Sequence, residues 1–485
     1  MNESTNQRIN ESTRSRAPWL MVVAIVGFAL IMFRQVLIPG YCLFTTDDNM
    51  GAIRLGKDCL RIFNGYWNDI VICGLPSGIV PIAWNALLIW LLPITCYINW
   101  IHALELVIAS LFFMLFLRCQ HITWPAMALG ILGALWVGSN LTLAYAGHVG
   151  KFGVVMMAAI ALFCVRHALF PKTNVLWGYL AGGAIGFMFL EQLDVALFFG
   201  FVLGAYALFL AIRQWQANGV WLKSVVALIL MGGVGLMLSA STMFSSYTAN
   251  VKGAVSMQTE SPREKWDYVT QWSWPPEECI DFIAPGYMGW RSSEPAGPYW
   301  GRMGRSPGWE QTRQGFMNFK LENQYLGIIP ILLAVFAVLM AIMGKGSWFT
   351  VDVPDAVGNS GSIPGMVRRP VSGVWCPFAA ERRAEILFWA CVAVITLLLA
   401  FGKFFPLYAL FYKLPLISSI RNPNKFLQIF QLALGILAAY GLDEVLRSKR
   451  PTSNAQRPMS DERPRIRHQM TDTGRQTTNT VDCGL

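Results

Sequence analysis

The sequence predicts an all-α, polytopic membrane protein with about ten transmembrane helices, each near the roughly 20 apolar residues that a bilayer requires. Hydrophobic residues make up 54% of the 485 residues and charged residues only 14%. So few charges could not cover the apolar surface of a soluble protein of this length, whereas lipid can surround it. Long apolar runs recur along the chain, and Lys and Arg gather between them, as is typical of membrane-spanning helices.

The apolar runs mark the expected helices in chain order. The first, 18–38, follows a polar tail of residues 1–17 and lacks a small-residue cleavage site, so we interpret it as an uncleaved span. The other runs are 101–117, 123–141, 151–168, 175–192, 195–212, 221–243, 325–343, 384–402 and 424–442. Residues 80–92 are also apolar, but this run is short and stops at Pro93, which favours an interfacial or re-entrant segment.

The positions of Lys and Arg predict the orientation. If the N-terminus is cytoplasmic and residues 80–92 do not span the membrane, the cation clusters between spans all fall on the cytoplasmic side. Lys and Arg are more frequent in cytoplasmic loops than in outer ones. These clusters are Arg118, Arg166 with Lys172, Arg213 with Lys223, Lys345, Arg368, Arg369, Arg382 and Arg383, and Arg447 with Lys449 and Arg450. Both termini are therefore predicted to be cytoplasmic.

This orientation defines the expected domains. A transmembrane domain, 18–446, would carry two large outer loops, 39–100 and 244–323, and one cytoplasmic loop, 344–383. The tail 447–485 has almost no apolar content, so we expect it to be disordered. The second outer loop should form a small folded cap, because its tryptophans supply apolar surface among prolines and glycines. They are Trp266, Trp272, Trp274, Trp290, Trp300 and Trp309.

Several function classes are excluded at this stage. The net charge of +10 comes without a basic stripe or a nucleic-acid motif, so we expect no nucleic-acid partner. No nucleotide-binding glycine loop, zinc spacing or Ser/His/Asp signature is present. The ten cysteines show no metal-ligand spacing; Cys42, Cys59 and Cys73 are candidates for disulfide pairing, with unpaired thiols as the alternative. An outer-face enzyme without a nucleotide would need an activated donor carried by the membrane.

Asp47 and Asp48 form the first candidate site, just beyond the first span. Adjacent carboxylates can bind a divalent cation, or one of them can act as a base on a substrate hydroxyl because the like charge of its neighbour raises its pKa. A solvated acidic loop is the alternative. The aromatic stretch that follows, 63–69, is unlike a simple spacer.

Other candidates lie at the outer ends of later spans. His148 and Lys151 sit among glycines and could meet a phosphate, although a turn with one interfacial base and one snorkelling lysine is an equal alternative. Glu191 and Asp194 flank a very short turn, where carboxylates either face a cavity or solvate the turn.

The segment before the last span carries two more cations. Arg421 and Lys425 lie beside a helix start, which favours an anionic lipid or phosphate site; membrane anchoring is the alternative.

Four segments together resemble the YfhO-like membrane proteins, within the GT-C class of lipid-linked-sugar glycosyltransferases. They are TTDDNMG with FNGYWNDIVICGLP, then LTLAYAGHVGKF, then ENQYLGIIPILLA, and last LPLISSIRNPNKFLQIFQLALGILAAYGLD. The resemblance covers about residues 18–446.

The resemblance implies a GT-C-like fold in a bacterial inner membrane, part of the cell envelope. Such a protein would transfer a sugar from a polyprenyl-phosphate donor to an acceptor on the outer face of the membrane. Asp47 or Asp48 would be the base or would hold a divalent cation. By charge and position, His148, Lys151, Arg421 and Lys425 are candidates for contact with the donor phosphate. We group Glu191 and Asp194 with them as substrate-binding candidates.

Two alternatives remain open. One is a transporter or flippase for a lipid-linked or small polar substrate, for which Glu105 and Glu191 are the charged residues in or near spans. The other is an inactive, shortened family member, since members of this family commonly continue beyond the last span, whereas this chain ends in a polar tail.

Overall fold

The computed structural model describes residues 3–43, 53, 66–68, 75–77, 83–219, 221–247, 261–289, 299–315, 317–318, 320, 323–344, 377–414 and 417–448. All of these belong to one compact unit, Met1–Ser448.

Helices dominate the described chain. The longer ones are α1 (Glu3–Met32), α5 (Ile94–Cys119), α6 (Trp124–Leu135), α7 (Gly138–Ala146), α8 (Val149–Leu169), α9 (Val175–Glu191), α10 (Leu193–Asn218), α11 (Leu222–Ser246), α14 (Ile328–Met343), α15 (Pro377–Ala400) and α17 (Phe426–Ser448). The short ones are α4 (Ala86–Leu91), α12 (Pro262–Val269), α13 (Trp309–Thr312), α16 (Pro406–Tyr412), and the 3-10 helices η1 (Arg34–Leu37), η3 (Pro276–Phe282), η4 (Gly402–Phe404), η5 (Ile417–Ser419) and η6 (Pro423–Lys425).

One small sheet departs from the all-α prediction. Strands β1 (Tyr66–Asn68) and β2 (Leu75–Ser77) pair antiparallel, with Trp67 opposite Pro76. Strands of three residues are too short to show the alternation that identifies a strand in a sequence. The all-α prediction is confirmed for the described chain as a whole, and this small sheet is a local feature of the first loop.

The prediction of a polytopic membrane protein is confirmed at the level of its helices. Among the described residues, six helices are long and apolar enough to cross a membrane: α5, α8, α10, α11, α15 and α17. The pair α6 and α7, bent by 48°, raises the number to seven if it counts as one span. Three more apolar helices, Ala17–Met32, Val175–Glu191 and Ile328–Met343, are shorter. Each predicted run thus contains a helix, while a total of about ten crossings stays a prediction.

The segment after η1 meets the bundle at α5, whose start differs from the prediction. Helix α5 begins directly after Pro93, several residues before the expected 101, and Asn99 within it binds the backbone of the segment that follows η1. Its side chain accepts from the Leu43 N–H (2.9 Å) and donates to the Tyr41 carbonyl (3.0 Å). The run 80–92 holds only α4, whose six residues extend about 9 Å and cannot cross a bilayer.

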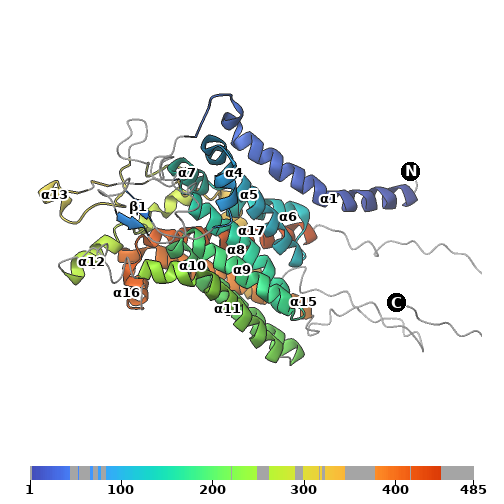
Figure 1. The fold of residues 1–485 in the computed structure, drawn as a ribbon. Helices are drawn as coiled ribbons and strands as arrows, with labels where there is room; N and C mark the ends of the chain where they lie inside the picture. The colour runs from blue at the N-terminus through green and yellow to red at the C-terminus, as the bar shows by residue number, and fades with distance from the viewer. Residues whose placement is uncertain are drawn as a thin grey trace, which may run out of the picture. The chain divides into compact units, whose positions relative to one another are not determined.

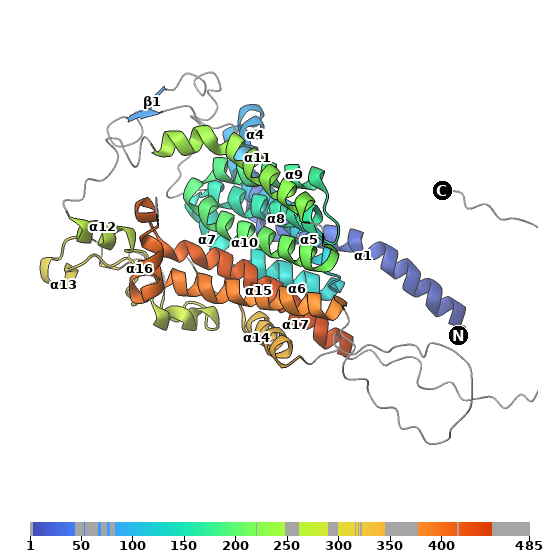
Figure 2. The same ribbon diagram turned by 90° about the horizontal axis from the view of Figure 1, so that it is seen from below.

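The bundle consists of two packed groups of helices. Helices α5, α8, α9, α10 and α11 pack in one group, and α6, α14, α15 and α17 in the other; Figure 2 shows α14, α15 and α17 side by side. Aromatic contacts join the groups: Trp389 of α15 lies 5.2 Å from Tyr206 of α10 and 6.3 Å from Phe116 of α5, between ring centroids. Helix α11 leaves residues such as Met237 exposed, as a lipid-facing helix would.

A Trp-rich region, which we call the cap (the described residues between 261 and 320), lies at one end of the bundle. Helices α12 and α13 are at this end in both views, together with α16 (Figure 1, Figure 2). The backbone N–H of Trp274 donates to the Ala400 carbonyl at the end of α15 (2.8 Å), and the Trp274 indole stacks on Phe282. We call this end of the bundle the cap end and the other the far end.

Buried ion pairs tie the helices together near the far end. Arg166 of α8 bonds to Glu385 of α15 at 2.7 Å and pairs with Glu381 one turn away. Arg382 of α15 bonds to Asp443 of α17 at 2.8 Å. Charges in spans are costly unless paired, and these ion pairs join α15 to α8 of the other group and to α17 of its own group.

Candidate functional site

The candidate site lies at the cap end, where α8 and α10 begin and η6 leads into α17. Asp194 is in the first turn of α10, and the Val195 N–H donates to its Oδ1 at 2.7 Å. Lys425 forms an ion pair with the other oxygen of this carboxylate. Lys151, in the first turn of α8, also acts electrostatically on Asp194. Three candidates that are far apart in the sequence are therefore neighbours in space.

Glu191 packs against the glycines around His148. A Cβ atom on Gly153 would lie 2.5 Å from Glu191 Oε2, and one on Gly150 would lie 2.8 Å from the Glu191 carbonyl oxygen. These glycines thus admit the end of α9 against α8, where the sequence suggested a ligand. Gly147 ends α7 with a left-handed backbone (φ 85°), and His148 follows it as the residue that precedes α8.

Arg421 lies on the cap side of the same segment. Its guanidinium carbon is 3.8 Å from the ring centroid of Tyr268 in α12, a cation–π contact. The next residue, Asn422, donates its N–H to the Val269 carbonyl (3.1 Å). Arg421 therefore connects the cap to the segment before α17, which also carries Lys425.

Asp47 and Asp48 lie outside the described residues, so their role as base or as cation ligands stays a prediction. Within the part of the chain that the structure describes, no group of three His, Cys, Asp or Glu residues is placed to hold a metal ion.

Glu105 lies within the bundle and is completely buried. Among the described residues, the Trp84 side chain and the charge of Glu191 act on its carboxylate. One helical turn earlier in α5, the ring of His102 packs 4.7 Å from that of Phe152, next to the glycine that Glu191 contacts. The two carboxylates that the sequence singled out for the transporter alternative thus belong to one region.

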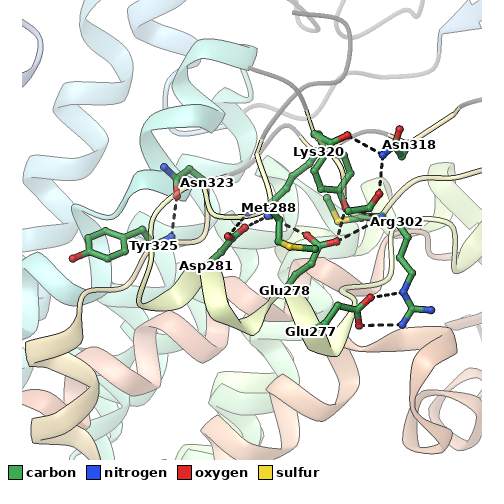
Figure 3. A network of polar contacts seen from close by, with 12 residues as sticks. Glu277, Glu278, Asp281, Met288, Arg302, Asn318, Lys320, Asn323 and Tyr325 are labelled. Carbon is green, nitrogen blue, oxygen red and sulfur yellow. Dashed lines mark hydrogen bonds and ion pairs between the residues drawn. The ribbon is translucent and has the colours of Figure 1, made fainter. Parts of the chain in front are cut away.

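A buried charge network inside the cap was missed by the sequence analysis. Lys320 Nζ lies 3.1 Å from Glu278 Oε2 and also contacts Asp281, and all three side chains are almost fully buried (Figure 3). Tyr299 donates its hydroxyl to Glu278 at 2.5 Å. Burial, and then the Glu278 charge, raise the pKa of Tyr299 above its ordinary value. The i, i+3 spacing of Glu278 and Asp281 was a visible signal, but their cation is about 40 residues away.

Lys403 is a second cation that the sequence analysis did not single out. Its backbone N–H donates to Ser273 Oγ (3.0 Å), which places it where the cap meets the end of α15. Burial lowers the pKa of its amine below the ordinary value, Asp267 opposes this effect, and Arg302 adds to it. The junction between cap and bundle therefore carries positive charge in addition to Arg421 and Lys425.

Comparison of the chain with protein-family models, with curated proteins and with solved structures finds no match in any of the three.

Proposed function

We propose that this protein is a membrane-embedded, GT-C-type glycosyltransferase that moves a sugar from a polyprenyl-phosphate donor to an acceptor on the outer face of the membrane. The observation that supports the proposal best is the ion pair of Lys425 with Asp194 beside the cap, within electrostatic reach of Lys151. Positioned cations stabilise the charge that develops on a departing phosphate. In this proposal Asp194 holds Lys425 in place when no donor is bound.

The remaining residues divide the chemistry between them. Asp47 or Asp48 takes the proton of the acceptor hydroxyl, directly or through a bound cation, as its oxygen attacks the sugar. The bond between the sugar and the phosphate breaks, and polyprenyl phosphate departs toward Lys151 and Lys425. The cap covers the sugar, and its tryptophans offer flat apolar faces for the sugar C–H groups.

Sugar transfer in proteoliposomes tests this proposal. Polyprenyl-phosphate glucose, galactose and mannose serve as labelled donors, with a cell-envelope extract as acceptor. We expect Lys425→Gln to lower kcat/KM by tenfold to a hundredfold, since a charged hydrogen bond contributes roughly 1.5–3 kcal/mol. Asp47→Asn or Asp48→Asn should lower kcat further. Lys413→Gln, which removes an exposed cation from the same outer segment, is the matched control.

Transport of a lipid-linked or small polar substrate is a second candidate, favoured by the buried carboxylate of Glu105 in α5 and its interaction with Glu191. The same proteoliposomes distinguish the two. The transport hypothesis predicts that a fluorescent polyprenyl-phosphate sugar crosses the bilayer, that Glu105→Gln stops this crossing, and that no donor releases its sugar. These three results together would favour transport over sugar transfer. Transfer that is equal in wild type, Lys425→Gln and both Asp variants contradicts the transferase site.

A further inference from the structure

A cavity opens at the far end of the bundle, remote from the candidate site. Its volume is about 520 Å³, and it lies between the turn that joins α8 to α9 and the start of α11. The residues that matter in its lining are His167, Lys172, Thr173, Trp177 and Lys223. No carboxylate belongs to the described lining, so the cavity presents two lysines and no opposing charge.

The backbone around the cavity also favours an anion. Helix α9 begins at Val175, a lining residue, and α11 begins one residue before Lys223. Two helix N-termini, each with a partial positive charge, thus border the same space, and at α9 the Asn174 side chain already accepts from the Leu176 N–H. Helix α8 ends here as well, but the N–H groups of Phe170 and Asn174 satisfy two of its last carbonyls (both 2.9 Å).

The side chains of the cavity are held in place by their neighbours. The imidazole of His167 stacks on the indole of Trp177, with centroids 5.0 Å apart, and its Nε2 lies 3.3 Å from Cys119 Sγ. Thr173 Oγ1 lies 3.3 Å from Ser224 Oγ, which joins the turn to α11. The cavity is therefore formed by ordered groups from three helices.

Its depth matches the headgroup layer of a membrane. Trp215 and Trp221 are exposed on either side of the turn between α10 and α11, at the same end as Lys223. Tryptophans of this kind gather at the boundary between lipid tails and water. A phospholipid can place its phosphate in a cavity at this depth while its acyl chains stay in the bilayer, so a lipid phosphate is the anion that suits the cavity.

We propose that this cavity binds the phosphate headgroup of one acidic phospholipid, with Lys172 and Lys223 as its cationic ligands and the Trp177 indole against its glycerol. Basic pockets between helices at the membrane surface suit such headgroups. This site is separate from the proposed transferase site and does not depend on it.

Native mass spectrometry of the full chain in a non-ionic detergent tests the proposal. We expect one molecule of phosphatidylglycerol to bind more tightly than phosphatidylcholine of the same acyl chains. The variant Lys172→Gln/Lys223→Gln should weaken this binding about tenfold or more, and Lys172→Arg/Lys223→Arg should restore it. The control is Arg118→Gln/Arg213→Gln, which removes two cations outside the cavity lining.

Three outcomes would overturn the proposal. One is wild-type affinity for phosphatidylglycerol in the Lys-to-Gln variant, provided that the variant elutes and melts like wild type. A second is an equal loss in the control, which would indicate general attraction between cations and acidic lipid. The third is binding of soluble glycerol phosphate as tight as that of phosphatidylglycerol, which would assign the cavity to a free phosphate.

Discussion

At the scale of single residues, the cap depends on a lysine that water does not reach. Lys320 is 1% exposed and is the only described cation in contact with Glu278 and Asp281. Its ammonium also lies 4.6 Å from the ring centroid of Trp274, whose backbone N–H donates to the Ala400 carbonyl of α15. The charge of Lys320 is therefore tied to the position of the whole cap.

Removal of this charge should destabilise the cap. Lys320→Met leaves two buried carboxylates without their cation, and such a loss costs about 3–5 kcal/mol. We expect a lower Tm than that of wild type, measured as the fraction that still elutes as a monodisperse peak after heating. A variant that melts at the wild-type temperature would contradict this account of the network.

Arg302→Gln is the matched control, because it breaks an ion pair in the same region that is open to solvent. Both Arg302 and Glu277 are nearly half exposed, so we expect a loss below about 1 kcal/mol. The Arg302 hydrogen bond lowers the pKa of the Glu277 carboxyl below its ordinary value. The small contribution of this ion pair to stability is therefore fully present above the unfolded-state pKa of Glu277. It is lost as the pH falls through the lower, folded-state pKa of the same carboxyl.

At the scale of elements, α9 and α11 approach each other along a row of glycines. Gly178, Gly182 and Gly186 recur every fourth residue on one face of α9, the small-residue spacing that brings helices together in membranes. A Cβ atom on Gly182 would lie 2.7 Å from the Met231 carbonyl oxygen, and one on Gly186 would lie 2.7 Å from Leu238 Cβ. Nothing lies within 4 Å of a Cβ atom on Gly183.

Two alanine substitutions one residue apart test this packing. Gly182→Ala forces α9 away from the α11 backbone and should destabilise the protein by about 1–3 kcal/mol. Gly183→Ala should be neutral, or stabilising by up to about 1 kcal/mol, since alanine favours a helix. The difference between their Tm values measures the effect on stability of the close contact between α9 and α11. Equal Tm values for the two variants would show that this contact has no effect on stability.

The same helices show what a sequence can predict. Apolar runs identify helices because burial in lipid acts on each run by itself, so the predicted run 175–192 becomes α9. Asp194 and Lys425 were both singled out at helix ends, but their contact joins residues 231 positions apart. Pairings of this kind depend on how helices pack, and neither Lys320 nor Lys403 carries a local signal of its partner.

At the scale of the whole molecule, the arrangement of α8, α9 and α10 supports more crossings than helix length alone gives. Helix α9 starts beside the end of α8 and reaches Gly150 and Gly153 near the start of α8 with Glu191. It therefore runs along most of a helix that is itself long enough to span. That α9 crosses the membrane with α8 and α10, although it has only 17 residues, stays a prediction.

Cysteine labelling tests the orientation that the cation clusters predict. In a background with the native cysteines replaced by serine, Arg263→Cys in the cap should react with a membrane-impermeant maleimide on intact cells. Lys172→Cys at the far end should react only after permeabilisation, because positive charge stays on the cytoplasmic side. Val394→Cys, on the exposed apolar face of α15, should react in neither condition. Labelling of Arg263→Cys and Lys172→Cys from the same side would contradict the predicted topology.

The segment that joins the cap to α17 acts as a very short tether. The Asn424 N–H is bonded to the Trp272 carbonyl of the cap (3.2 Å), and the very next residue, Lys425, is paired with Asp194 of α10. Adjacent Cα atoms are only about 3.8 Å apart, so one peptide unit and one lysine side chain separate this contact with the cap from the contact with α10. A molecule that draws Lys425 away from Asp194 would act on the residue next to the Asn424 hydrogen bond, so we expect occupancy of the site to loosen one of the contacts that hold the cap.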